Sequence, residues 1–395
     1  MSDQKLRMYI SRWAQKCGAP GLSLFTFDTV TGALEPNCHL DEEKSFGCSL
    51  LDPVKQVLYV CNEGNLFPET PYDTGRVYCY KVDPVTGHLS LLNYKDTFCP
   101  FTSYLNLDPT GKFLMVSNHT WTAYATTVEQ DENGRFYPVP HTNDSICNLF
   151  AINEDGSLGD MVDIAKHPAA PGLHFTLEGR VRTPHPHCVM RSPSGKVFAV
   201  CDKGDGQLYL YGIDAQNGKL KLLSRTVTDT PDSEPRYCAF HPTKPYLYVN
   251  HEHTPGDVLT MTTLRYQEDG TVEELGKLYI DVSAYRPVEE FRQMQGMCIS
   301  ADGRFVYVQA HGYNLILVLK VNEQTGLLEQ YAETPVEGEW PRSITLSPDG
   351  RFLINCCLAG QISVFSVEVD GTLTDTGHRA FLQGSGYVTF AECGG

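Results

Sequence analysis

Apolar and polar positions alternate along this chain in short runs, and one twelve-residue pattern recurs. Each copy starts with a turn of Pro, Gly or Asp type, continues through a short β-branched and aromatic run, and ends on polar residues. Such a sequence predicts a hairpin turn followed by a buried strand. The six copies are DPVKQVLYVCNE (52–63), DPTGKFLMVSNH (108–119), SPSGKVFAVCDK (192–203), HPTKPYLYVNHE (241–252), SADGRFVYVQAH (300–311) and SPDGRFLINCCL (347–358).

A second pattern consists of an alternating strand, a turn centred on Asp or Gly, and then a Leu or Val. Its seven copies lie at 24–34, 77–89, 148–158, 208–220, 262–272, 317–328 and 364–373. Two strand-like runs remain unpartnered, MYIS (8–11) near the start and GYVTFAE (386–392) near the end. A ring in which the last strand completes the first unit accounts for both runs.

Four strands in units of about 50 residues are typical of β-propellers. We therefore predict an all-β protein, a single seven-bladed β-propeller domain over residues 1–395. We expect four-stranded blades and a ring closed by the C-terminal strand pairing with the N-terminal blade. The second and third copies of the first pattern start 84 residues apart, which predicts an insertion within 120–182. Its aromatic residues Trp121, Tyr124, Phe136 and Tyr137 suggest a lid.

Composition narrows the possible partners. The net charge is −17, from 31 basic and 48 acidic residues, which argues against nucleic acid or an anionic membrane as the main partner. No apolar run has the length of a signal peptide or a membrane span, so we expect a cytoplasmic protein. The 14 cysteines are scattered without a CxxC pair, which predicts reduced, buried thiols rather than a zinc site. No Trp is followed by Asp, so WD40 repeats fit poorly.

The repeat also predicts where chemistry can take place. An antiparallel hairpin returns the chain, so residues before its first strand lie at the same end as residues after its second. Both sets should therefore face one mouth of the central channel. Before the first strands stand His185, His187, Arg236 and Arg342; after the second strands stand Asn62 and Glu63, Asn118 and His119, Asp202 and Lys203, His251 and Glu252, and Ala310 and His311.

Three segments carry a resemblance to a known family: PHPHCV…SPSGKVFAVCDKG (184–204), EPRYCAFHPTKPYLYVNHE (234–252) and PRSITLSPDGRFL (341–353). They resemble the propeller lactonases, which include cycloisomerase-type 6-phosphogluconolactonases and carboxy-muconate cyclases. The resemblance implies hydrolysis of a sugar lactone to the open aldonic acid. It implies His187 as the general base, Arg236 as an anion or oxyanion clamp, and Glu252 as the partner that orients one of them.

Histidine, arginine and carboxylate suit these roles. Histidine titrates near neutral pH and can activate water, and a guanidinium can hold an oxyanion, a phosphate or a carboxylate. We expect a small-molecule substrate, an anionic lactone, and no required cofactor or catalytic metal; a structural divalent ion in the channel and the oligomeric state stay open. The substrate-binding candidates are His185, Glu63, Asn118, His119, Asp202, His311 and Arg342.

The chain departs from the family pattern at four places. His311 stands where the family usually has Arg, Gly296 where it often has an acidic residue, His119 where it has Tyr, and Leu358 where it has Gln. These replacements suggest a pocket with altered specificity and do not identify the particular lactone that is the substrate.

Other interpretations fit the same residues. The protein could be a lactonizing cyclase or isomerase acting on a muconate-like diacid, or a non-enzymatic propeller that binds a protein. The strand-end histidines can cap turns, Arg236 and Arg342 can bridge blades, Glu63 can be a solvated rim charge, and Asp202 can make an Asx-turn. His185 and His187 can also be metal ligands, since residues two apart on a strand share a face.

Overall fold

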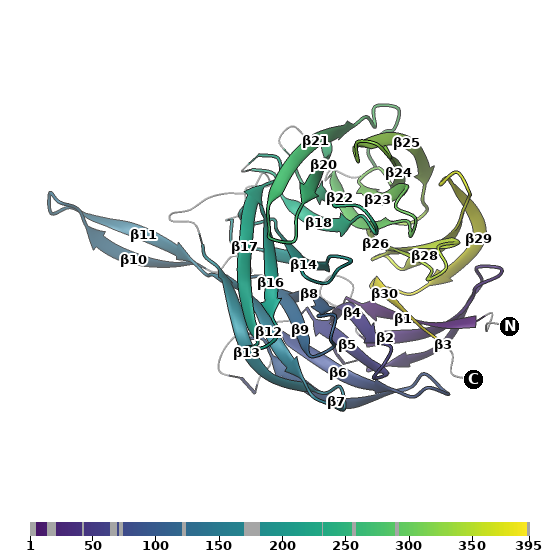
Figure 1. Cartoon of the computed structure of the whole chain (residues 1–395), viewed down its shortest axis with the longest axis horizontal. Helices are drawn as coiled ribbons and strands as arrows, with labels where there is room; N and C mark the ends of the chain where they lie inside the picture. The colour runs from purple at the N-terminus through teal and green to yellow at the C-terminus, as the bar shows by residue number, and fades with distance from the viewer. Residues whose placement is uncertain are drawn as a thin grey trace.

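Seven four-stranded antiparallel sheets form a ring in the computed structural model (Figure 1). The structure describes residues 5–13, 21–41, 43–63, 69–70, 74–120, 124–169, 182–230, 232–254, 258–288 and 292–392. None of the described elements is a helix that could cross a membrane. The predicted seven-bladed β-propeller is confirmed.

Each blade contributes one strand to the wall of the channel, and we number the blades from the one that holds the N-terminal strand. The innermost strands contact their neighbours around the ring. In blade order they are β30 (Ser385–Glu392), β4 (Phe46–Asp52), β8 (Thr102–Leu107), β14 (Pro186–Arg191), β18 (Pro235–Phe240), β22 (Gln293–Ile299) and β26 (Pro341–Leu346). The second strands are β1 (Lys5–Arg12), β5 (Val57–Asn62), β9 (Phe113–Asn118), β15 (Phe198–Asp202), β19 (Tyr246–His251), β23 (Phe305–His311) and β27 (Phe352–Cys357).

The outer half of each blade is a hairpin. The third strands are β2 (Gly21–Asp28), β6 (Arg76–Val82), β12 (Ser145–Ile152), β16 (Gln207–Asp214), β20 (Leu259–Tyr266), β24 (Leu315–Val321) and β28 (Gln361–Val367). The outermost strands are β3 (Leu34–Leu40), β7 (Leu89–Asp96), β13 (Leu158–His167), β17 (Lys219–Val227), β21 (Val272–Ile280), β25 (Leu328–Pro335) and β29 (Leu373–Phe381).

Both sequence patterns correspond to the blade they predicted. Every copy of the twelve-residue pattern ends in a second strand, and these strands are almost wholly buried because sheets of adjacent blades cover both faces. Every copy of the second pattern forms the third strand, its turn and the start of the outermost strand, where polar positions alternate with partly buried ones.

The ring closes as predicted, through β30 pairing antiparallel with β1 from Leu6 and Glu392 to Arg12 and Ser385. Closure joins the two ends of the chain in blade 1 and places that blade against blade 7. One apolar cluster spans this junction and includes Ile10 and Phe27 of blade 1 and Ile354 of blade 7. The Oγ of Ser343 on β26 also donates a hydrogen bond to the carbonyl of Gly386 on β30.

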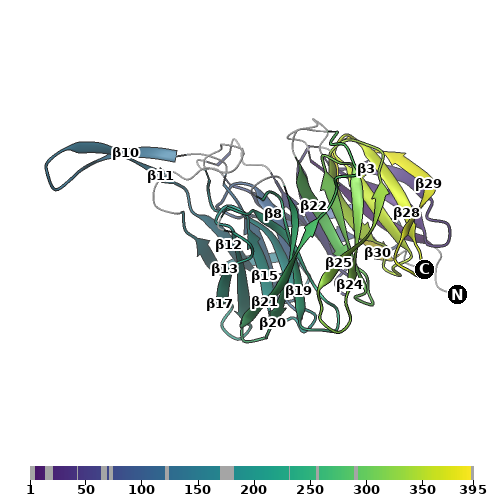
Figure 2. The same cartoon turned by 90° about the horizontal axis from the view of Figure 1, so that it is seen from above.

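The predicted insertion lies between the second and third strands of blade 3. Part of it is a two-stranded hairpin, β10 (Tyr124–Gln130) and β11 (Phe136–Thr142), which extends away from the ring (Figures 1 and 2). Phe136 is 73% exposed on it. Trp121 and residues 170–181 lie outside the described residues, so the lid stays a prediction.

The absence of a side chain at Gly296 has a steric reason. A Cβ there would lie 2.7 Å from the Cα of Ser343 and 2.8 Å from the backbone nitrogen of Ile344, both on the innermost strand of the next blade. Backbone atoms cannot move aside as a flexible side chain can. Blade 6 can therefore approach blade 7 closely only because residue 296 is glycine.

We expect Gly296→Ala to lower the free energy of unfolding by about 1–3 kcal/mol, the usual cost of overpacking. Gly212→Ala on β16 is the matched control, because its Cβ would meet no atom closer than 3.7 Å. Urea unfolding of both variants measures the difference. Equal stability of the two variants would contradict the steric explanation.

Candidate active site

The last two residues of each twelve-residue copy face opposite ways, because successive side chains of a strand alternate. The eleventh residues bond to the scaffold: Asn62 to the carbonyl of Ser45, Asn118 to Asn148 and His251 to Thr262 within their own blades, and Asp202 of blade 4 to His167 of blade 3. The twelfth residues Glu63, His119, Lys203 and Glu252 instead contact charged or imidazole groups at the mouth. Of these two neighbouring positions, the eleventh therefore belongs to the scaffold and the twelfth to the site.

His187, Arg236 and Arg342, which were expected just before the innermost strands, are the second residues of these strands, and β-bulges turn them toward the mouth. In blade 4 the register pairs Pro186 with Asp202 and then Cys188 with Cys201, so His187 is skipped. Arg236 after Pro235 and Arg342 after Pro341 are skipped in the same way. A bulge leaves its extra residue unpaired and redirects its side chain, and proline suits the first residue of a strand. The Pro-His and Pro-Arg pairs of the sequence are therefore bulge signals.

Glu63 lies between two partners from other blades. Its carboxylate oxygens are 3.5 Å from Nη2 of Arg342 in blade 7 and 3.7 Å from Nε2 of His119 in blade 3. Burial acts to raise the pKa of Glu63, but His119 and Arg342 outweigh it and hold the pKa below its usual value. The guanidinium of Arg342 also lies 4.8 Å from the centre of the Trp13 ring, within cation–π range. Glu63 is thus a buried ionised group, not a solvated rim charge.

Three imidazoles form a row of nearly parallel rings. The centroids of His119 and His185 are 3.7 Å apart at an interplanar angle of 10°, and those of His185 and His187 are 5.8 Å apart at 8°. Burial lowers the pKa of all three, and the nearby cations add to this for His185 and His187, whose pKa values lie well below the usual range. The row is therefore neutral at neutral pH. Stacked rings do not direct their nitrogens at one point, which disfavours a metal held by His185 and His187.

Arg236 and Glu252 form the second charged group at the mouth. Nη1 of Arg236 donates to Oε2 of Glu252, which also accepts from Nζ of Lys203 at 2.7 Å. Although burial acts to raise it, the two cations hold the pKa of Glu252 well below its usual range. The Lys203–Glu252 pair joins blade 4 to blade 5, whereas Arg236 and Glu252 belong to the same blade. Glu234, whose pKa is raised mainly by burial, lies 4.0 Å from Lys203.

Two of the expected catalytic residues keep polar atoms unused. Nε and Nη2 of Arg236 and Nδ1 of His187 are buried and have no hydrogen-bond partner among the described residues. Buried polar groups are rarely left unsatisfied in a native protein, and each such case needs an explanation. Binding of a substrate or of water would explain these unpaired atoms. Both side chains contact the ring of Tyr237, and Arg236 lowers the pKa of His187, so the two residues belong to the same part of the mouth.

Aromatic residues pack around these two side chains. The ring of Tyr237 meets that of His187 edge-on at 4.9 Å, and the guanidinium of Arg236 lies 5.4 Å from the centre of the Tyr237 ring. The Tyr237 hydroxyl bonds that of Tyr387, which comes from the ring-closing strand. Tyr104 meets both rings edge-on. These phenols hold His187 and Arg236 in place.

Two of the expected substrate-binding residues, Asp202 and Asn118, form hydrogen bonds to the scaffold. Asp202 is fully buried and accepts from Nδ1 of His167 at 2.7 Å, from the backbone nitrogen of His185 at 2.6 Å and from that of Gly204 at 2.9 Å, which confirms the Asx-turn interpretation. Asn118 donates to Asn148 and to the carbonyl of Ile146. Asp202 is therefore a scaffold residue, and the amide nitrogen of Asn118 also binds the scaffold, whereas the buried Oδ1 of Asn118 has no hydrogen-bond partner among the described residues. His311 packs edge-on against Trp340, with the ring centroids 6.4 Å apart.

Four residues at the mouth were not among the expected site residues: Lys203, Glu234, Tyr237 and Tyr387. Lys203 was expected at the mouth but was not among the substrate-binding candidates, although it holds the same twelfth position as Glu252. Glu234 and Tyr237 flank the Pro235-Arg236 pair. Tyr387 carries no repeat signal, because only the closure of the ring brings it to the centre.

We expect Asp202→Asn to lower the free energy of unfolding by about 1.5–3 kcal/mol. The carboxylate accepts several buried hydrogen bonds through two oxygens, whereas an amide has one oxygen and a nitrogen that can only donate. The Michaelis constant should change less than stability. Urea unfolding and substrate saturation curves measure the two effects. An unchanged stability with a large rise in the Michaelis constant would instead make Asp202 a substrate ligand.

Comparison with known proteins identifies the family of the chain. The family described as lactonase, 7-bladed beta-propeller, matches residues 7–390. The 6-phosphogluconolactonase of Bacillus subtilis (strain 168) is 26% identical over 343 residues, which cover 86% of this chain and 84% of that protein. A 6-phosphogluconolactonase of Formosa agariphila is 24% identical over 351 residues, covering 88% of each chain.

Solved structures agree on the fold. The periplasmic gluconolactonase of Pseudomonas aeruginosa superposes with a TM-score of 0.78 at 20% identity, covering 98% of this chain and 99% of that one. At this identity the likeness speaks for the architecture alone. Together with the match over residues 7–390, it places the chain in the lactonase family of seven-bladed β-propellers.

Proposed function

We propose that this protein hydrolyses a sugar lactone to the open aldonic acid. The observation that carries the proposal is the pairing of a buried neutral His187 with the unused donors of Arg236. Lactone hydrolysis needs a base for water and positive charge where the carbonyl oxygen becomes an oxyanion. A site of buried, convergent charged groups also suits an enzyme better than a binding scaffold, which would present a broad apolar patch.

The reaction follows from these positions. His187 accepts a proton from water as the oxygen of that water attacks the lactone carbonyl. Nε and Nη2 of Arg236 stabilise the oxyanion that forms. When the tetrahedral intermediate collapses, the ring C–O bond breaks and the leaving alkoxide takes the proton from His187. The product is a hydroxy acid, which ionises in solution, and the enzyme returns to its starting state without a cofactor.

Glu252 and Lys203 position Arg236 in this scheme. Glu252 binds the Nη1 end of the guanidinium, which turns the other two nitrogens toward the substrate. Lys203 shares the same carboxylate oxygen, so the pair does not fully neutralise Arg236. Arg342 in blade 7, held by Glu63, offers a second guanidinium at the mouth for an anionic group of the substrate. The two curated relatives described above are 6-phosphogluconolactonases, which supports a phosphorylated sugar lactone.

Hydrolysis of sugar lactones, phosphorylated and not, in a pH-stat tests the proposal directly. We expect His187→Ala to lower kcat/KM by about 10²–10⁴-fold, as for the loss of a general base. Arg236→Ala should lower it by about 10²–10³-fold, as for the loss of an oxyanion donor. His88→Ala and Arg265→Ala are the matched controls, because both residues are exposed and remote from the mouth.

Equal rates for the wild type and both site variants would overturn the assignment of the site. Turnover of carboxymuconate without hydrolysis of any sugar lactone would favour the lactonizing cyclase instead. Unchanged melting of the site variants must accompany the loss of activity.

The pH profile provides an independent check on His187. Burial and Arg236 lower its pKa well below 6.5, so the neutral base persists to lower pH and the acidic limb of kcat/KM should lie below pH 6.5. Removal of a nearby cation raises that pKa, so Arg236→Met should move the limb to higher pH. Removal of a nearby anion lowers it, so Glu252→Gln should move the limb the other way. Shifts in the same direction would contradict the role of His187.

A further inference from the structure

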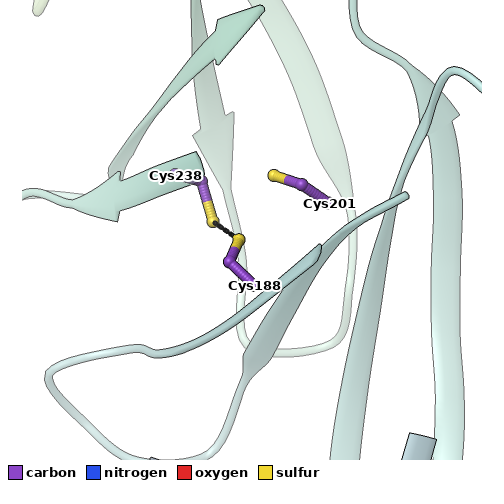
Figure 3. A group of neighbouring side chains, drawn as sticks. All are labelled: Cys188, Cys201 and Cys238. Carbon is purple, nitrogen blue, oxygen red and sulfur yellow. Dashed lines mark hydrogen bonds between the residues drawn. The ribbon is translucent and has the colours of Figure 1, made fainter. Parts of the chain in front are cut away.

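Three cysteines meet in the core between blades 4 and 5, close to His187 and Arg236 in the sequence. Cys188 on β14, Cys201 on β15 and Cys238 on β18 turn their sulfurs toward one another (Figure 3). Their Sγ atoms all lie within 4.8 Å of one another, and those of Cys188 and Cys238 are 4.0 Å apart. All three thiols are free and buried. Scattered cysteines thus form a cluster that no sequence spacing indicates.

The cluster is distinct from the other buried cysteines. Within the described ranges, it is the one group of three cysteine, histidine or acidic side chains with ligand atoms this close. Cys61 holds the same tenth position of the repeat in blade 2 as Cys201 does in blade 4, without such a group around it. Three different strands hold the sulfurs of the cluster, and Cys188 and Cys201 face each other in the register of the blade. The sulfurs are therefore held by the sheets rather than by a loop.

The separations fit a metal ion in the plane of three sulfurs. With metal–sulfur bonds of about 2.3 Å, as for zinc, such a site needs sulfurs about 4.0 Å apart. Cys188 and Cys238 already have this separation. The other two separations would need to shorten by less than about 1 Å, since none exceeds 4.8 Å. Rotation about the Cα–Cβ bonds can supply a movement of this size.

The surroundings select the ion. Structural zinc sites almost always have four ligands, whereas the described residues bring three sulfurs together in an apolar cluster with Val197, Leu208 and Val249. Thiolate ligands favour soft ions such as copper(I), which accepts two or three sulfurs.

We propose that Cys188, Cys201 and Cys238 bind one copper(I) ion that ties blade 4 to blade 5. Binding replaces thiol protons, which pass to solvent, and no electron is transferred because the metal enters and remains as copper(I). Cys188 directly follows the bulge at His187, and Cys238 lies two residues after the bulge at Arg236. The ion would therefore fix the two strands that present these side chains. The proposal does not depend on the lactonase assignment.

The test loads the full-length protein with copper(I) under anaerobic conditions and then challenges it with the copper(I) chelator bathocuproine disulfonate. We expect one copper per chain to remain in the wild type and in the matched control Cys61→Ala. Cys201→Ala and Cys238→Ala should lose their copper, with at least a tenfold fall in affinity. Equal retention by all four proteins, or loss of copper from the wild type, would overturn the proposal.

Copper K-edge absorption of the loaded wild type keeps the proposal testable even if both Cys201→Ala and Cys238→Ala fail to fold. It should find sulfur neighbours only, at about 2.3 Å. Nitrogen or oxygen neighbours would place the ion elsewhere and reject the site. Added copper(I) should also raise the melting temperature of the wild type and Cys61→Ala, because a ligand that binds the folded state stabilises it.

Discussion

Pairing of β30 with β1 is the constraint on which the rest of the molecule depends. A strand from the C-terminus completes the blade that the N-terminus begins, and this joins blade 7 to blade 1 through a shared apolar cluster. Without it, the faces of both blades would be open to water and the innermost strands would no longer form a closed wall. Closure also brings Tyr387 against Tyr237 at the centre. The mouth exists because the ring is closed.

A closed mouth concentrates charge that the fold has to stabilise. Moving ions out of water is costly, and buried ions persist only when they are paired and hydrogen-bonded. The charges at this mouth follow that rule: Glu63 lies against Arg342 and His119, and Glu252 against Arg236 and Lys203. The imidazoles avoid the cost by remaining neutral. Arg236 and His187 combine burial and unused polar atoms with the chemical types that a base and an oxyanion donor require, which is why they are the strongest candidates for chemistry.

The sequence was sufficient for the architecture because both repeat patterns report local physics, namely turn residues and alternating burial. It also predicted which end of each hairpin forms the mouth. It did not separate the eleventh from the twelfth position, so Asp202 and Asn118 were grouped with Glu63 and His119, although alternation places them in the blades. The bulges were not predicted, because the Pro-His and Pro-Arg pairs can be identified as bulge signals only once the register of the two strands is known. Tyr387 and the Cys188–Cys201–Cys238 cluster arise from tertiary contacts between distant segments.

The bulges explain why the site is precise although it is built from strand ends. A side chain on a loop is held by few contacts, whereas His187 and Arg236 are each followed by residues packed in the core between blades 4 and 5. The bulge frees one residue per strand from pairing and leaves the next in the ladder, so the side chain is redirected without loosening the backbone. Orientation within a fraction of an ångström is what general-base and oxyanion chemistry requires. The rigidity of the blades, rather than a mobile loop, therefore sets the geometry between His187 and Arg236.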